Sequence, residues 1–283
     1  MSIKVHNLSY VYDKGLSFEK TALKNVSVTI EEGKIVGIIG HTGSGKSTLI
    51  QHMNGLIKPP AKGMVWVDDM DLYEQQKEVF LICQKVGMVF QYPEMQLFED
   101  TVEKDIGFGP KNLGLNEEEV HDRVVEALGM VDLDYDSIRS RQPFFMSGGE
   151  KRRIAIAGIL AMKPKYLIMD EPTAGLDPYA REQLLDEIVY INREKKITVI
   201  MVSHDMDEIA RLTDYLYVMN QGQIALHGKT SDVFAQFEKI QEIGMMLPQV
   251  TEILIGLSNK CPNVNYSIFN LDAAVNEILK CRC

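Results

Sequence analysis

The sequence predicts an α/β fold built on a parallel β-sheet. Short apolar runs typical of buried parallel strands recur along the chain, at residues 35–39, 86–90, 166–171 and 197–202. The first run passes through a glycine-rich loop directly into a helical segment. Polar residues end or follow the later runs, at the strand ends where ligands of such sheets gather. Strands that alternate with helices in this way are typical of α/β domains.

The chain before the loop predicts antiparallel strands at residues 4–12 and 23–31, separated by a polar excursion. Tyr10 and Tyr12 alternate with Val11, so the two tyrosines share one face of the first strand. A tyrosine just ahead of a phosphate-binding loop could stack on an adenine ring. It could equally fill the edge of the sheet, and the pattern alone leaves both roles open.

Residues 40–48 match the phosphate-binding pattern G-x-x-x-x-G-K-[ST], in the required context of a preceding strand and a following helix. Glycines let the backbone point its N–H groups inward, and the helix N-terminus adds the positive end of its dipole. Lys46 can reach the β- and γ-phosphates, and the Ser47 hydroxyl can hold Mg²⁺. The sequence therefore predicts a nucleoside triphosphate site formed by Gly40, His41, Thr42, Gly43, Ser44, Gly45, Lys46, Ser47 and Thr48.

Beyond the loop helix we expect a turn at 58–63, a short strand at 64–68 and a polar helix at 72–84. Gln91 ends the strand at 86–90, where its amide can reach the phosphates or an attacking water. A glutamine in this place is also an ordinary turn residue, so the position alone does not decide its role.

Residues 92–162 predict a helical region without strands. Asn116 is the expected N-cap of an acidic helix at 116–130, whose first turn carries three glutamates. A second helix opens in the segment 146–150 and runs to Met162. Ser-Gly-Gly at a helix start can bind an anion, although a serine cap followed by glycines is common.

Two carboxylates end the strand at 166–171. Asp170 suits Mg²⁺, usually through a water, and Glu171 can orient and deprotonate a water that attacks the γ-phosphate. The strand at 197–202 ends at Ser203 and His204, where the imidazole can donate to the γ-phosphate. Taken alone, the carboxylates could also cap a helix and the histidine could be structural.

The last part of the chain predicts a hairpin at 215–219 and 223–227, followed from Ser231 by a helical, Met-rich region. An amphipathic terminal helix is expected after an Asn270 cap. Its apolar stripe packs on this domain or on a partner, and comprises Leu271, Ala274, Val275, Ile278 and Leu279.

Composition narrows the classes of function. The net charge of −10 argues against non-specific binding to nucleic acid. We expect neither a signal peptide nor a membrane span, since no apolar run is long enough to cross a bilayer. Four scattered cysteines give no disulfide framework, so a cytosolic protein is expected. Cys281 and Cys283 could bind metal or form a strained bridge, but free thiols at a frayed terminus are the simpler interpretation.

Together these motifs resemble those of ATP-binding cassette (ABC) ATPases. GHTGSGKST, Gln91, MSGGE, LIMDEP, the GLD at 175–177 and His204 occur in that family's order and spacing. The resemblance implies a P-loop NTPase of the ABC type at residues 1–230, with a RecA-like core, an N-terminal antiparallel β subdomain and an α-helical signature subdomain at about 92–163. A small helical extension, expected to serve dimerisation, would follow at 231–283. Met146 and Gly175 depart from the usual residues without removing a catalytic group.

The resemblance also implies a role for each motif. ATP and Mg²⁺ would be the cofactors, and the working unit would be a head-to-tail dimer with two ATP at its interface. Tyr12 would stack on adenine, and Asp177 would lie in a loop that crosses the interface. The implied catalytic residues are Glu171, His204, Gln91 and Lys46; the implied Mg²⁺ residues are Ser47, Gln91 and Asp170; and the implied signature residues, acting on the partner's ATP, are Ser147, Gly148, Gly149 and Glu150.

Within the family, FQYPEMQLFEDTV, DIGFGPKNLGL and AMKPKYLIMDEPTAGLDP look like the ATPases of energy-coupling factor (ECF) transporters, of the second type of the ATPase pair. This resemblance implies ATP hydrolysis that powers uptake of vitamins or related micronutrients. Expected partners are a second, non-identical ATPase, a transmembrane coupling subunit and an exchangeable substrate-binding membrane subunit, with the chain peripheral on the cytoplasmic face of the membrane. A homodimer stays open, and the alternative function is a soluble ABC ATPase that remodels a ribosome or nucleic acid complex.

The stretch 92–100 predicts the surface that couples the ATPase to its membrane partner. It follows Gln91 and carries aromatic and methionine side chains beside Glu94, Glu99 and Asp100. Such a surface suits a basic, amphipathic helix. Packing within the helical region is the competing interpretation, and for Leu97 it is preferred.

Overall fold

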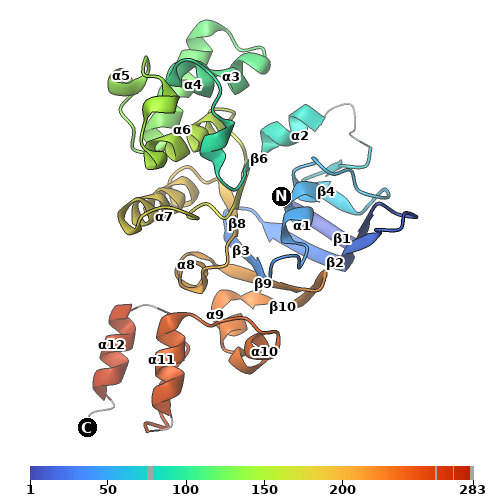
Figure 1. Cartoon of the computed structure of the whole chain (residues 1–283), viewed down its shortest axis with the longest axis vertical. Helices are drawn as coiled ribbons and strands as arrows, with labels where there is room; N and C mark the ends of the chain where they lie inside the picture. The colour runs from blue at the N-terminus through green and yellow to red at the C-terminus, as the bar shows by residue number, and fades with distance from the viewer. Residues whose placement is uncertain (75–78, 259, 270, 281–283) are drawn as a thin grey trace.

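Five parallel strands end at one edge of a six-stranded sheet, and this edge positions the functional residues (Figure 1). The strand order is β10-β9-β3-β8-β7-β6, and β10 pairs with β9 in the antiparallel sense. This computed structural model describes residues 1–283 except 75–78, 259, 270 and 281–283. The strands are β3 (Ile35–Gly40), β6 (Val86–Val89), β7 (Tyr166–Asp170), β8 (Thr198–Val202), β9 (Tyr215–Asn220) and β10 (Gln223–Lys229).

A second sheet, antiparallel and four-stranded, packs against one face of the first. Its order is β2-β1-β4-β5. Helix α1 (Lys46–Met53) shares an apolar cluster with both sheets, in which Leu49, Ile50 and Met53 are fully buried. This burial anchors the loop that leads into α1. The strands are β1 (Ser2–Tyr12), β2 (Lys20–Glu31), β4 (Val65–Val67) and β5 (Met70–Asp71).

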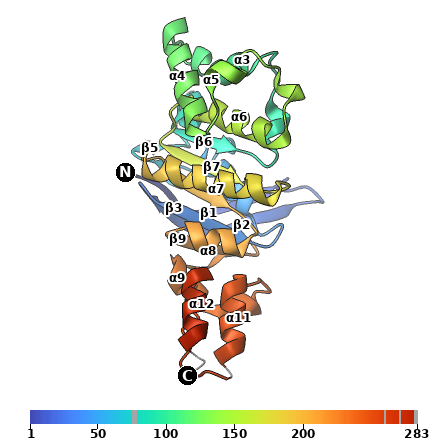
Figure 2. The ribbon, with the colours of Figure 1, turned by 90° about the vertical axis from the view of Figure 1, so that its left-hand side faces the viewer.

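Helices α7 (Pro178–Arg193) and α8 (Met206–Leu212) cover the opposite face of the main sheet (Figure 2). The buried strands alternate between the two faces. Met169 and Met201 belong to the cluster under α7, whereas Ile168 and Ile200 belong to the cluster around α1. Both faces of the central strands are therefore buried, as their uninterrupted apolar sequences predict.

A helical subdomain extends from the β6 side of the sheet, at the top of Figure 1. The predicted Asn116 cap is confirmed, because Asn116 and Glu119 accept hydrogen bonds from each other's backbone N–H at 2.9 Å. Ser147 and Glu150 form the same reciprocal cap at the start of α6. The helices are α3 (Val102–Asn112), α4 (Glu117–Met130), α5 (Tyr135–Ile138) and α6 (Gly148–Leu160), with short 3₁₀ turns at Pro93–Gln96 and Pro143–Phe145.

The C-terminal region lies at the other end of the molecule (Figure 1). Phe234 and Ile240 join the main core, while Leu254, Val264 and Ala274 form a separate small cluster between the last two helices. Among the residues described, no helix has both the length and the apolar character needed to cross a bilayer. The helices are α9 (Thr230–Phe234), α10 (Phe237–Glu242), α11 (Gln249–Ser258) and α12 (Leu271–Lys280).

Most expected elements are present, with ends shifted by a few residues. The start of the helix expected at 72–84 is wrong, and its later part is present as α2 (Val79–Lys85). Residues 72–74 form a turn, in which Asp71 Oδ1 accepts from the Tyr73 N–H at 3.0 Å. Residues 75–78, the Asn270 cap and the cysteines at 281 and 283 lie outside the described residues.

Arg152, on α6, fastens the helical subdomain to the core. Its guanidinium is almost fully buried and bonds both carboxylate oxygens of Glu94, at 3.0 and 3.1 Å. It also donates to the carbonyls of Pro172 and Ala174, each at 2.8 Å. Glu94 follows β6 and the two carbonyls follow β7, so one side chain joins three segments next to the strand ends.

We predict that Arg152→Leu destabilises the protein by about 3–5 kcal/mol, because it leaves the Glu94 carboxylate and two carbonyls without their donor. Urea unfolding measures the change. Arg193→Leu, at an exposed arginine near the end of α7, is the matched control and should change stability by less than about 0.5 kcal/mol. Equal effects of the two substitutions would contradict this role for Arg152.

Candidate functional site

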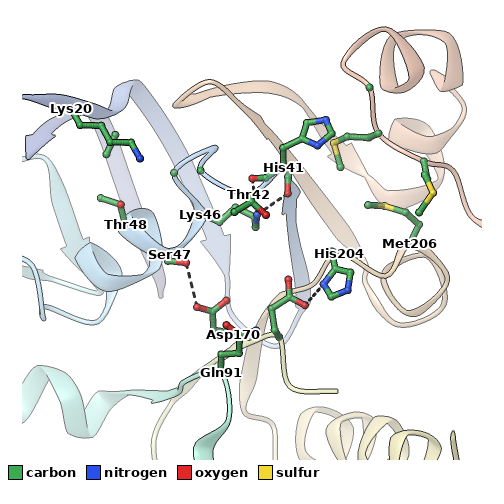
Figure 3. Close-up of a pocket in the computed structure, with 18 of the residues that line it drawn as sticks. Lys20, His41, Thr42, Lys46, Ser47, Thr48, Gln91, Asp170, His204 and Met206 are labelled. Carbon is green, nitrogen blue, oxygen red and sulfur yellow. Dashed lines mark hydrogen bonds and ion pairs between the residues drawn. The ribbon is translucent and has the colours of Figure 1, made fainter. Parts of the chain in front are cut away.

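A cavity of about 660 Å³ opens at the carboxyl edge of the main sheet (Figure 3). The phosphate-binding loop forms one wall, and the ends of β6, β7 and β8 form the facing wall. The sequence-predicted residues that line it are Tyr12, Gly40, His41, Thr42, Gly43, Gly45, Lys46, Ser47, Thr48, Gln91, Asp170, Glu171 and His204. Ser44 is buried within the loop instead.

Two glycines let the loop pack closely on its neighbours. Gly40 has φ +152°, and a Cβ there would lie 2.4 Å from the Met219 carbonyl oxygen. Gly45 has φ +104°, and its Cβ would lie 2.6 Å from the Ala22 carbonyl oxygen. Any side chain at either position would displace the backbone of β9 or β2, so the loop can occupy this place only with glycine.

The Lys46 ammonium lies at the mouth of the loop. It donates to the Gly40 carbonyl at 2.7 Å and to the His41 carbonyl at 3.1 Å. Burial lowers the pKa of Lys46, and the nearby carboxylates of Glu171 and Asp170 oppose that shift. A polyanion in the cavity would raise the pKa of Lys46, as these carboxylates do, and would stabilise the charged amine.

Asp170 and Ser47 bring two oxygen ligands together across the cavity. The Ser47 hydroxyl donates to Asp170 Oδ2 at 3.4 Å. Burial, and then the charge of Glu171, raise the pKa of Asp170, while Ser47 and Lys46 act against the increase. A divalent cation would compensate the buried negative charge. Mg²⁺ prefers a few such oxygen ligands supplemented by phosphates and water, so these residues fit it.

Glu171 lies opposite the loop in a constrained conformation. Its φ is +50°, and its N–H donates to the Val202 carbonyl at 2.8 Å. The carboxylate Oε2 lies 2.5 Å from His204 Nδ1, the contact marked in Figure 3. His204 follows the end of β8 and lines the cavity, and its side chain is three quarters exposed. The pair can hold and orient a water and accept its proton.

Tyr12 reaches the cavity from the end of β1. Its hydroxyl bonds Thr48 Oγ1 at 3.2 Å, and its ring packs edge-on against Tyr10 with centroids 4.9 Å apart. The two tyrosines thus share a face, as their alternation predicts. Lys20, paired with Tyr12 across β1 and β2, lines the same part of the cavity and was not identified from the sequence.

The signature residues and Asp177 do not join this cavity. They line a second one, of about 340 Å³, between the starts of α6 and α7. Asp177 Oδ1 caps α7 by accepting from the N–H groups of Tyr179 and Ala180 at 3.0 Å. The signature residues on this cavity are Ser147, Gly148, Gly149 and Glu150. Within one chain the two sets of predicted residues are therefore separate.

The remaining wall of the first cavity comes from residues that sequence reasoning missed. Met206 begins α8 directly after its N-cap, Asp205. The other three residues come from the C-terminal region and are Gly244, Met245 and Met246. No motif marks these residues, and the last three lie beyond the expected end of the nucleotide domain. Ala22, on β2, completes the lining near Tyr12.

Comparisons with known proteins agree with this geometry. Residues 23–174 match the family model for ABC transporters. The chain is 49% identical over 280 residues to the energy-coupling factor transporter ATP-binding protein EcfA2 of Clostridium perfringens (strain 13 / Type A), covering 99% of this chain and 98% of that protein.

Solved structures give the same family likeness. The structure of cbiO1 from Clostridium perfringens, part of the ABC transporter complex cbiONQ, matches with a TM-score of 0.75 and 36% identity, covering 89% of this chain and 98% of that one. The ATP-binding cassette MJ0796, a dimer in a post-hydrolysis state bound to ADP and Pi, matches with a TM-score of 0.71 and 28% identity, covering 81% and 98%.

We predict that Lys46→Ala weakens ATP binding by roughly ten- to a hundredfold, because a charged hydrogen-bond donor is lost. Glu171→Gln should keep ATP affinity within about threefold and lower the hydrolysis rate at least about a hundredfold, since only proton acceptance is removed. Nucleotide titration and phosphate release measure the two effects. Glu118→Gln, on the exposed face of α4, is the control, and a wild-type rate in Glu171→Gln would exclude the assigned role.

Proposed function

The chain belongs to the ABC transporter family, among the ATP-binding proteins of energy-coupling factor transporters, and we propose that it works as one half of a head-to-tail ATPase pair docked on membrane subunits. It binds ATP with Mg²⁺ and hydrolyses ATP to drive transport. The observation that carries the proposal is the convergence of Lys46, the Ser47–Asp170 contact and the Glu171–His204 contact on one cavity.

The chain's own residues divide the work of hydrolysis. Mg²⁺, when bound, neutralises phosphate charge as the terminal phosphoryl group is transferred. Lys46 and the loop N–H groups bind the phosphates, and Ser47 with Asp170 holds the metal. Glu171 orients a water and accepts its proton. His204 fixes the Glu171 carboxylate, and Gln91 faces the same space from the end of β6.

A second ATPase subunit would complete the site. The signature cavity, with Gly148 and Gly149 at the N-terminus of α6, offers backbone donors to an anion but lies apart from this chain's own phosphate loop. In a head-to-tail pair, the signature cavity of each chain faces the loop of the other. The MJ0796 cassette bound to ADP and Pi is dimeric, which supports pairing of two ATPase subunits.

The cargo and the membrane partners follow from the ECF relationship. We propose that the partners are a non-identical ATPase, a transmembrane coupling subunit and an exchangeable substrate-binding subunit, and that vitamins or related micronutrients are imported. The chain would then sit peripherally on the cytoplasmic face. Co-purification from detergent-solubilised membranes tests this assembly. The alternative, a soluble ATPase that remodels ribosomes or nucleic acid, finds no support in the relatives' names.

The stretch 92–100 offers an apolar surface for the membrane subunit. Met95 is 82% exposed and Phe98 56% exposed, with Phe98 packed edge-on against Phe108. Leu97 is buried, as expected for packing within the subdomain. The expectation that Glu94 offers a free charge to the membrane subunit is wrong, because both of its carboxylate oxygens bond Arg152. Reversing the charge of Glu94 would leave the buried Arg152 guanidinium without its partner. Asp100 stays exposed.

We predict that Met95→Ser together with Phe98→Ser lowers recovery of the membrane complex at least about tenfold, because exposed apolar anchors dominate interface energy. ATP affinity should stay within about twofold, since neither side chain lines the cavity. Phe18→Ser, at a phenylalanine 65% exposed in the β1–β2 loop, is the control. Undiminished recovery and transport in the double variant would move the coupling surface elsewhere.

The apolar stripe of the terminal helix α12 has a buried part and an exposed part. Ala274 and Ile278 pack in the cluster shared with α11. Leu271, Val275 and Leu279 are exposed, by 68%, 47% and 51%. We propose that this exposed face contacts the second ATPase. Deleting residues 231–283 would be a poor test, because Phe234 and Ile240 belong to the main core.

The sharper prediction is that Leu271→Ser, Val275→Ser and Leu279→Ser together weaken nucleotide-free association of the ATPase pair by at least about tenfold, through lost apolar burial. Sedimentation velocity without ATP measures this. A matched triple variant, Leu16→Ser, Phe18→Ser and Leu56→Ser, removes equally exposed apolar side chains from loops elsewhere. Identical association of the two triple variants would mean that α12 does not hold the pair.

A further inference from the structure

His41 belongs to the phosphate-binding loop, but its side chain serves the C-terminal region. Its ring points away from Lys46 and toward the salmon-coloured C-terminal segment (Figure 3). His41 Nε2 lies 3.0 Å from the carbonyl oxygen of Ile243, so a protonated Nε2 donates a hydrogen bond there. The contact joins residues 202 positions apart in the chain.

The segment 243–249, here called the strap, is fitted closely to that histidine. Gly244 has φ +84°, and a Cβ at this position would lie 3.4 Å from His41 Nε2. Met245 and Leu247 are buried in the main core, whereas Met246 is 72% exposed and lines the nucleotide cavity. The strap thus forms part of the wall of the cavity.

The far end of the strap is attached next to the other wall. The Gln249 N–H, at the start of α11, donates to Asp207 Oδ1 at 2.9 Å. Asp207 lies in the first turn of α8, three residues after His204. The strap therefore bridges the phosphate loop at one end and the helix that follows the His204–Glu171 pair at the other.

We propose that the strap is part of the nucleotide site, and that bound nucleotide changes its position through His41 and Asp207. This inference rests on the proposed ATPase function. Phosphates that bind the N–H groups of the loop would shift the loop and His41 with it. A movement of His204 would shift α8, which begins two residues later. Because α11 continues the strap and packs on α12, the same movement reaches the exposed face of α12.

Hydrogen–deuterium exchange on the full chain tests the proposal, with ADP as the probe. ADP should slow exchange in peptides spanning 243–258 of the wild type. The comparison is made at a protein concentration where sedimentation gives the same association state with and without ADP, so that subunit pairing does not cause the protection.

Gly244→Val and Gly114→Val are the matched pair. Gly114 has φ +80°, but a Cβ there meets nothing within 4 Å, so both variants carry similar backbone strain and only the side chain added at 244 lies against a neighbour, His41. Gly244→Val should abolish the ADP-dependent slowing and weaken ADP binding roughly three- to tenfold, while Gly114→Val should change neither.

His41 gives an independent test. His41→Ala should lose the exchange response, and His41→Gln, which keeps an amide donor, should retain part of it. Equal responses in Gly244→Val and Gly114→Val, or no slowing in a wild type that binds ADP, would overturn the inference while leaving the ATPase assignment intact. A wild type that binds neither ADP nor ATP would overturn both.

Discussion

Parallel pairing of β3, β8, β7 and β6 is the constraint on which the site depends. The register sets Asp170 beside Val202 and Val89 beside Met169, so the strands end at the same level. Functional residues that are far apart in sequence meet at this edge of the sheet because each one follows the end of a strand. The sheet is rigid through burial on both faces, which holds the Ser47–Asp170 contact across the cavity.

Helix caps serve two purposes in this fold. Ser147 accepts from the Glu150 N–H in the first turn of α6, Asp177 accepts from the Tyr179 and Ala180 N–H groups in the first turn of α7, and both capping residues line the second cavity. The Ser147 cap does not engage the N–H groups of Gly148 and Gly149 at the start of α6, and this chain's own phosphate loop lies at the other cavity. A cap that stabilises the monomer therefore also presents an anion-binding surface to a partner.

Sequence reasoning reached the strands and thirteen of the nineteen residues that line the first cavity, because the chemistry of those thirteen is local to motifs. Gly40, Lys46, Asp170 and Glu171 sit in short patterns whose spacing fixes the backbone. Met246 could not be found this way, since its place depends on how 243–249 folds back after some 200 residues. Glu94 was misjudged for the same reason: its buried partner, Arg152, is distant in sequence.

The two long-range contacts also suggest how the site communicates. Arg152 ties the loop after Glu171 to Glu94, in the stretch that follows Gln91, so the helical subdomain is attached to the hydrolytic side of the cavity. His41 ties the phosphate loop to Ile243 and hence to the C-terminal helices. A change in the cavity would therefore act on the proposed membrane-facing stretch 92–100 and on the proposed subunit-facing face of α12 through different residues. The two connections share no residue, so a substitution at His41 acts on the C-terminal helices without removing the Arg152 contacts.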